Sequence, residues 1–174
     1  DRRRRKKNWH ARLERMAGMP DHHLYICGNL DDREYIEGLH EKIATLKLTN
    51  VHITGPISSA EKVWLYQHAE AFLFPSMFEG FGLPVIEAMQ FGTPVFTSNM
   101  TSLPEVAGGH AFIWEGFDPD YMTATLLENL PLLKNDAVRR EQMISYATSF
   151  NLEKNIRQYV SLYQRLATKS ASGA

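Results

Sequence analysis

The sequence has little of what marks secreted, membrane or nucleic-acid-binding proteins. Its single cysteine, Cys27, excludes an internal disulfide and suits a reducing compartment. No apolar run approaches the length of a membrane span, and no segment has the apolar core of a signal peptide. A net charge of -1 gives no general attraction to nucleic acid or anionic membranes. We therefore expect a cytoplasmic protein without a transmembrane segment or a nucleic-acid partner.

Length and composition fit one globular domain. The 174 residues, 44% of them hydrophobic, are enough to bury a core without disulfides or metals. Charge is concentrated only at residues 2–7 (RRRRKK), which form either a solvated chain end or a phosphate contact. We expect a basic segment over residues 1–7, one domain over residues 8–167, and a flexible tail over residues 168–174.

Short apolar runs alternate with helical patterns along the whole chain. Strands are predicted at 22–28, 51–55, 71–76, 94–98 and 110–114. Helices are predicted at 32–48, 59–68, 83–90, 118–133, 136–149 and 152–166. Such alternation is typical of an α/β domain with a doubly wound, Rossmann-like parallel sheet and helices on both faces. Ligands of such folds bind beyond the carboxyl ends of the strands, here in the loops at 28–31, 55–59, 75–82 and 98–103.

The loop at 75–82 has the chemistry of an anion site. Pro84 suits the first turn of the helix that follows, and Gly80 and Gly82 allow a ligand to approach the backbone closely. Free N–H groups and the helix dipole at such a terminus favour phosphate. The alternative is that the two glycines merely permit a tight turn.

Two glutamates flank this glycine turn. Glu87 lies in an otherwise apolar stretch of the helix, where a carboxylate needs a partner; a ribose diol would provide two donors. The alternatives are a helix-edge Glu87 that reaches water and a solvated loop acid at Glu79. Their spacing alone is weak evidence, because thirteen glutamates in a chain of this length give about one such pair by chance.

The longer strings are more specific than the pair. LYQHAEAFLFPSMFEGFGLPVIEAMQFGTPVFTS, preceded by LYICG and VHITGPIS and followed by SNMTSLPEVAGGHAFIW, FDPDYMTATLLENL and SFNLEKNIRQYVSLYQRL, resembles the C-terminal domain of the family 4 retaining glycosyltransferases. The resemblance covers roughly residues 6–167. It implies one half of a GT-B fold that binds a nucleoside-diphosphate sugar and passes the sugar to a glycan or lipid-linked acceptor.

The resemblance also implies roles for particular residues. Glu79 is the catalytic position beside the donor sugar, and Glu87 holds the ribose hydroxyls. Ile57 packs against or hydrogen-bonds the base through its main chain. The backbone amides that face the sugar hydroxyls and the diphosphate belong to Gly80, Phe81, Gly82 and Leu83.

Lys7 corresponds to the family's diphosphate-binding lysine, assisted by one of Arg2 to Arg5. The donor is a UDP-, GDP- or ADP-sugar, and no cofactor is implied. No D-x-D-like metal motif stands at a strand end, because the pairs at 31–32 and 118–120 fit helix caps better. We therefore expect metal-independent transfer.

The N-terminus departs from the family pattern. The family's domain begins with a central apolar strand before the lysine, where this chain has DRRRRK, and four arginines do not replace a buried strand. Either the first strand is missing, or the sheet is completed in another way; the acceptor domain is absent from these residues. A non-catalytic nucleotide-sugar-binding module and a structural fragment that binds nothing remain alternatives. The resemblance places the full-length enzyme in polysaccharide biosynthesis, at the membrane surface.

Overall fold

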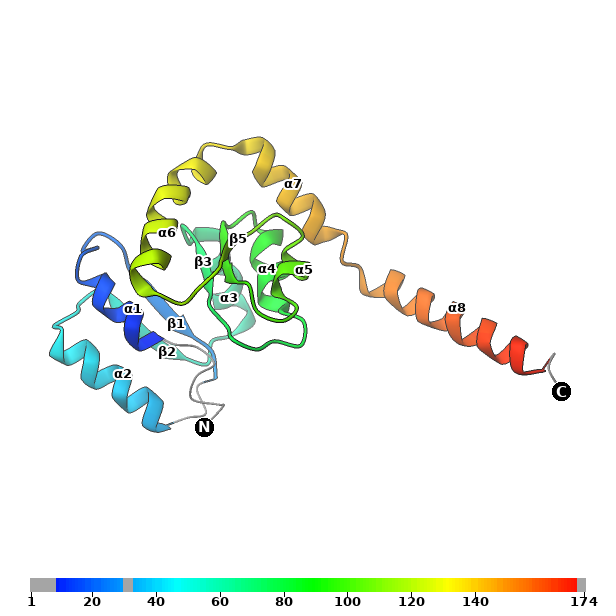
Figure 1. The fold of residues 1–174 in the computed structure, drawn as a ribbon, viewed down its shortest axis with the longest axis horizontal. Coiled ribbons are helices and arrows are strands. Elements are labelled where there is room, and N and C mark those ends of the chain that lie inside the picture. The colour runs from blue at the N-terminus through cyan, green and yellow to red at the C-terminus, as the bar shows by residue number, and fades with distance from the viewer. Residues whose placement is uncertain (1–8, 30–32, 172–174) are drawn as a thin grey trace.

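A computed structural model describes residues 9–29 and 33–171 (Figure 1). The helices are α1 (Trp9–Met16), α2 (Arg33–Thr45), α3 (Ser59–His68), α4 (Leu83–Gln90), α5 (Leu103–Ala107), α6 (Pro119–Lys134), α7 (Ala137–Thr148) and α8 (Leu152–Ala171). The strands are β1 (Leu24–Cys27), β2 (Val51–Gly55), β3 (Phe72–Phe74), β4 (Val95–Ser98) and β5 (Phe112–Trp114). Every predicted strand is present, and the predicted helices agree with the observed ones to within a few residues, except that α8 continues to Ala171.

All strand pairs among the described residues are parallel. β1 pairs with β2, and Leu24 lies opposite Val51. β4 lies between β3 and β5, where its Phe96 is opposite both Leu73 and Phe112. The parallel arrangement confirms the prediction made from the alternation of strands and helices.

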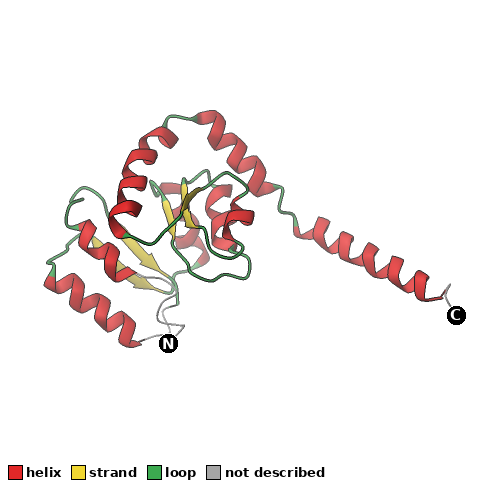
Figure 2. Ribbon diagram, in the orientation of Figure 1, coloured by secondary structure: helices red, strands yellow, loops and turns green. Residues whose placement is uncertain are grey.

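Helices cover both faces of the central strand β4, as Figure 2 shows. Val95 points into a cluster with residues of α3, α4, α5 and α7. Phe96, its neighbour, points to the other face and packs with Trp114 and with Met122 of α6. Alternate side chains of a strand face opposite sides of a sheet, so an entirely buried strand requires cover on both. This part of the fold is doubly wound, as expected.

A second core lies between the other two strands and the first two helices. Leu13 of α1 and Leu39 of α2 are fully buried there against Ile26 of β1. Leu73 of β3 packs against this cluster and also against the cluster around Phe96. One strand therefore touches both cores.

The sheet is divided into two pieces. Within the described residues, the two-stranded sheet β1–β2 and the three-stranded sheet β3–β4–β5 share no backbone pairing. β1 thus has one unpaired edge, and so has β3. The expectation of a missing first strand concerned the residues before Lys7, which lie outside the described residues.

Helix α8 extends away from the rest of the molecule (Figure 1). Its described side chains are all exposed, although several of them are large and apolar. They include Ile156, Tyr159, Tyr163 and Leu166. No helix of the described chain has the length and apolar character needed to cross a membrane.

Candidate functional site

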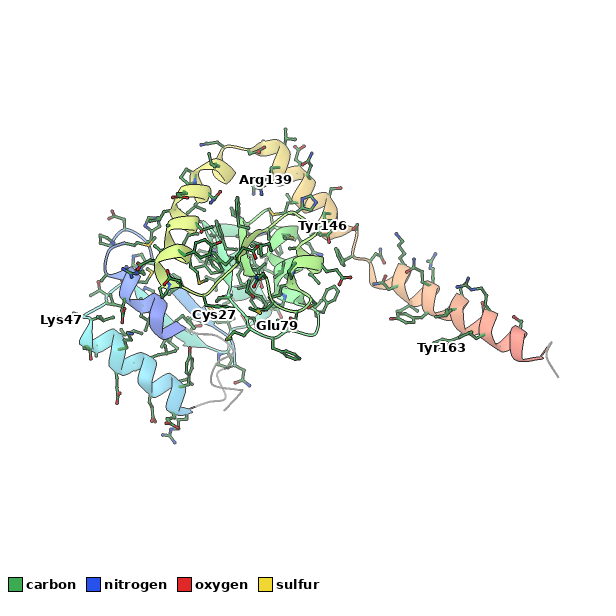
Figure 3. All side chains as sticks on the ribbon, in the orientation of Figure 1. Cys27, Lys47, Glu79, Arg139, Tyr146 and Tyr163 are labelled. Carbon is green, nitrogen blue, oxygen red and sulfur yellow. The ribbon has the colours of Figure 1, made fainter. Side chains whose placement is uncertain are left out.

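The predicted site residues gather where β3 and β4 end. The loop from β3 to α4 carries Glu79, labelled in Figure 3, and the loop from β4 to α5 lies beside it. Ser76, near the start of the first loop, is buried, and its carbonyl accepts a short hydrogen bond from the hydroxyl of buried Ser98 on β4. Because β3 and β4 are parallel, their carboxyl ends present both loops on one edge of the sheet.

Glu79 is held on three sides. The hydroxyl of Ser76 donates to its Oε1 at 2.6 Å, and its own N–H donates to Oγ1 of Thr101 at 3.1 Å. Ser102 Oγ donates to its carbonyl oxygen at 3.3 Å. Thr101 has a positive φ of 52°, an uncommon backbone conformation that turns the second loop toward the first. Ser76 therefore orients the carboxylate of Glu79, while Thr101 and Ser102 hold its backbone.

The glycine turn opens the N-terminus of α4. Gly82 is the N-cap residue, has a φ of 102°, and provides no side-chain hydrogen bond to the first turn. Pro84 lies in that first turn, as predicted. The first N–H groups of a helix lack intrahelical partners, so an uncapped start can offer them to an anion. Gly80 is exposed, with no atom within 4 Å of where a Cβ would stand. Space for a ligand is thus open at Gly80, whereas Gly82 is buried, and phosphate binding at this turn stays a prediction.

The two apolar residues of this turn lie at its outer surface. Phe81 is 43% exposed and meets the ring of Phe150 edge-on at 5.9 Å between centroids. Its carbonyl accepts a hydrogen bond from Ser102 Oγ at 2.9 Å. Leu83 is 62% exposed. Gly80, Phe81 and Leu83 are thus exposed, whereas Gly82 between them is buried.

Glu87 is bound by two residues of α3. Lys62 Nζ donates to its Oε1 at 2.9 Å, and the Tyr66 hydroxyl donates to its Oε2 at 3.1 Å. Burial, followed by the nearby Glu87 carboxylate, raises the pKa of the Tyr66 phenol, so that the hydroxyl remains a donor. Sequence reasoning missed both partners. The signal available was their spacing of four, which places them on one face of α3.

Two further predicted residues lie elsewhere. Ile57 is half-buried between β2 and α3, next to Ser58, the N-cap of α3. The contacts of α3 with Glu87 thus connect the region of Ile57 to the site. Lys7, the predicted diphosphate lysine, and Arg2 to Arg5 lie outside the described residues. Of the described side chains, no three or more of the metal-ligating types are grouped as a metal ion would need.

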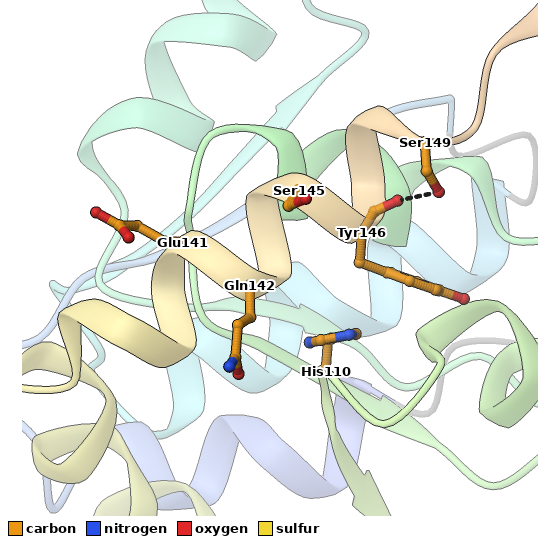
Figure 4. A pocket seen from close by; sticks show the side chains of 6 residues that line it. All are labelled: His110, Glu141, Gln142, Ser145, Tyr146 and Ser149. Carbon is orange, nitrogen blue, oxygen red and sulfur yellow. Dashed lines mark hydrogen bonds between the residues drawn. The ribbon is translucent and has the colours of Figure 1, made fainter.

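A separate hollow lies against α7 (Figure 4). It is an open groove of about 550 Å³, where the rings of His110 and Tyr146 lie 4.7 Å apart. Its other lining residues are Glu141, Gln142, Ser145 and Ser149. None of them belongs to the predicted site.

Known proteins resemble this chain in sequence. The O-antigen chain mannosyltransferase B of Escherichia coli is 34% identical over 116 residues, which are 67% of this chain and 30% of that protein. The O-antigen chain mannosyltransferase RfbU of Salmonella typhimurium is 29% identical over 157 residues, which are 88% of this chain and 42% of its own length. The chain therefore spans less than half of these relatives.

Solved structures share the fold. Anabaena Alr3699/HepE in complex with UDP and glucose matches with a TM-score of 0.77 at 19% identity, over 91% of this chain and 45% of that one. A glycosyltransferase from Rickettsia africae matches with a TM-score of 0.76 at 18% identity, over 94% of this chain and 46% of its own. The family model of the glycosyl transferases group 1 matches residues 1–150. The chain thus belongs to the glycosyl transferases group 1 family.

Proposed function

We propose that this chain is the C-terminal, donor-binding domain of a retaining family 4 glycosyltransferase. The observation that carries the proposal is the uncapped start of α4, with a glycine turn flanked by Glu79 and Glu87. A nucleoside-diphosphate sugar has three parts that suit this order: a sugar, a diphosphate and a ribose. The family match and the UDP-bound fold neighbour support the same interpretation.

The diphosphate is the part that the helix start would bind. The amides of Gly80 to Leu83 would face its oxygens, and Lys7 would add a positive charge. When the bond from the anomeric carbon to the diphosphate breaks, negative charge grows on the phosphate, and fixed donors stabilise that charge. Binding and promotion of bond cleavage would therefore use the same groups.

The sugar and nucleoside would lie on either side of the diphosphate. Glu79, fixed by Ser76 and Thr101, would contact the sugar hydroxyls or support its reacting face. Glu87 would accept from the ribose hydroxyls, and the main chain of Ile57 would contact the base. The base is that of a UDP-, GDP- or ADP-sugar, and we propose that neither a metal nor another cofactor is needed.

The acceptor requires groups beyond this domain. The relatives extend well past the matched segment, and two of them are O-antigen chain mannosyltransferases. We infer that the full-length enzyme extends a glycan or lipid-linked acceptor in polysaccharide biosynthesis at the cytoplasmic membrane surface. Residues 1–174 alone would bind the donor without turning it over.

Isothermal titration calorimetry tests donor binding. We expect the 174-residue chain to bind at least one of UDP, GDP and ADP, in buffer with EDTA as well as with Mg²⁺. Loss of a charge-assisted contact with the ribose in Glu87→Ala should weaken Kd about 10–100-fold. Glu128→Ala changes an exposed carboxylate of α6 and serves as the matched control. Absence of binding by every nucleotide, or equal Kd for wild type and Glu87→Ala, would contradict the proposal.

A further inference from the structure

Both carboxylate oxygens of Glu87 are engaged before any ligand arrives. Oε1 accepts from Lys62 Nζ at 2.9 Å and Oε2 from the Tyr66 hydroxyl at 3.1 Å. Each carboxylate oxygen has room for a second donor, so Glu87 can keep these bonds and accept two more. The α3 contacts therefore fix the direction of the remaining lone pairs without consuming them.

Tyr66 is the more rigid of the two partners. It is 8% exposed, and its ring meets Phe72 edge-on at 5.3 Å and stacks on Phe91 at 6.0 Å between centroids. Its backbone carbonyl accepts a short hydrogen bond from the buried Thr93 hydroxyl. Packing on several sides and a main-chain bond leave the phenol one position, and the hydroxyl points at Glu87.

Lys62 is less constrained. Its side chain is 41% exposed and that of Glu87 is 35% exposed, so solvent screens the ion pair. The ammonium group nevertheless bonds Oε1, the carboxylate oxygen that Tyr66 does not contact, and it opposes rotation of the carboxylate about its last bond. Its contribution to orientation should be smaller than that of the buried hydroxyl.

We propose that Tyr66 and Lys62 are positioning residues, which hold the Glu87 carboxylate so that it discriminates a ribose diol from a sugar lacking it. This inference rests on the proposed function, in which Glu87 binds the ribose. A freely rotating carboxylate would lose orientation entropy on binding the diol; a fixed one has already done so. Selectivity for ribonucleotides thus depends on helix α3 as well as on α4.

The test compares each nucleoside diphosphate with its 2′,3′-dideoxy form by calorimetry. Wild type should bind whichever of UDP, GDP and ADP it takes about 10–100-fold more tightly than the dideoxy form. In Tyr66→Phe, which keeps the ring and its packing, we expect this ratio to fall to about 5-fold or less. The Kd for the dideoxy form should stay unchanged. In Lys62→Met the ratio should fall by a smaller factor.

A matched control removes a hydroxyl elsewhere. Tyr146 on α7 donates to the Val106 carbonyl at 3.1 Å, and Tyr146→Phe should leave the ratio at the wild-type value. A merely structural role of Tyr66 would weaken ribose and dideoxy forms alike and leave their ratio unchanged; that result would overturn the inference.

The possible outcomes separate the two proposals. If Glu87→Ala abolishes the discrimination and Tyr66→Phe retains it, the inference fails and the proposed function stands. If wild type binds nucleotides but does not distinguish the diol, or binds none, the ribose role of Glu87 fails and the inference falls with it. If the ratio of the two Kd values falls in both Glu87→Ala and Tyr66→Phe and stays at the wild-type value in the control, the proposed function and the inference are both supported.

Discussion

Two glycines of the turn before α4 differ in what a side chain would meet. Gly82 has a φ of 102°, and a Cβ there would stand 2.7 Å from Cδ2 of Leu103. Gly80 has open space around the corresponding position. The two positions therefore require glycine for different reasons. At Gly82 the reason is the backbone conformation, and at Gly80 it is access for a ligand.

Gly82→Ala should lower the free energy of unfolding by about 1–3 kcal/mol, because it adds left-handed backbone strain and crowds Leu103. Urea unfolding followed by circular dichroism measures the change. Gly80→Ala, the control, should stay within about 0.5 kcal/mol of wild type. Equal effects of the two substitutions would show that the positive φ at Gly82 is not what requires glycine.

The residues most visible in the sequence were the two acids, and their partners were not visible at all. Glu79 and Glu87 stand out because a carboxylate in an apolar or glycine-rich string is unusual. Thr101 and Lys62 belong to other segments, and only the packing of those segments brings them to the acids. Local patterns cannot predict such contacts, because they depend on which loops and helices meet.

At the scale of elements, helix α3 depends on its first turn. Ser58 and Glu61 form a reciprocal capping box: the Glu61 N–H donates to Ser58 Oγ, and the Ser58 N–H donates to Glu61 Oε2 at 2.7 Å. The hydroxyl and then the backbone N–H of Ser58 lower the pKa of the Glu61 carboxyl below its ordinary value near 4.5. The cap holds the helix that carries Tyr66.

A carboxyl whose pKa is lower in the folded than in the unfolded state stabilises the fold at pH values above its unfolded pKa. That contribution is lost as the pH falls from about 4.5 through the lower folded value. Glu61→Ala should therefore have a lower Tm than wild type at pH 7, and the difference should shrink below pH 4. Thermal melts across this pH range measure it, with Glu128→Ala as the control. A Tm difference that is independent of pH would rule out the ionised cap.

Elements with strong periodicity or continuous apolar character were predictable from the sequence. The helix at 83–90 agrees with α4, and the buried strand at 94–98 contains β4. Helix α5, five residues long, was not predicted, because its Pro104 and the following glycines are equally typical of a loop. The division of the sheet could not be obtained from local pattern, since strand pairing is decided between distant segments.

At the scale of the whole molecule, α8 stands apart from the packed domain. Its apolar residues recur at 152, 156, 159, 163 and 166, a spacing of four and three that forms one stripe along a helix. From Ile156 to Leu166 the residues of this stripe are exposed. A continuous apolar stripe of this kind favours association with another surface.

Truncation after Asn151 should leave the free energy of unfolding within about 0.5 kcal/mol of the full chain, because the described side chains of α8 are exposed. Sedimentation velocity should show less self-association of the truncated chain. Circular dichroism at 222 nm should decrease in magnitude by the contribution of this helix. The control replaces Ile156 and Tyr163 with serine. It keeps the full length of α8 and removes only apolar residues of the stripe. A drop in stability of several kcal/mol on truncation would show that α8 packs on the domain.

The two cores share Leu73 and are also bridged by the ion pair between Arg15 of α1 and Asp120 of α6, and this connection bears on how cooperatively the chain unfolds. A single melting midpoint describes a protein only when its parts lose structure together. Here the cluster of α1, α2, β1 and β2 and the clusters around β4 share the side chain of Leu73.

Trp114, 2% exposed beside Phe96, reports on the β4 side. Trp9 and Trp64 fluoresce as well, so both would be replaced by phenylalanine to isolate the signal of Trp114. A fluorescence midpoint that then differs from the far-ultraviolet midpoint would show that the β1–β2 unit opens separately.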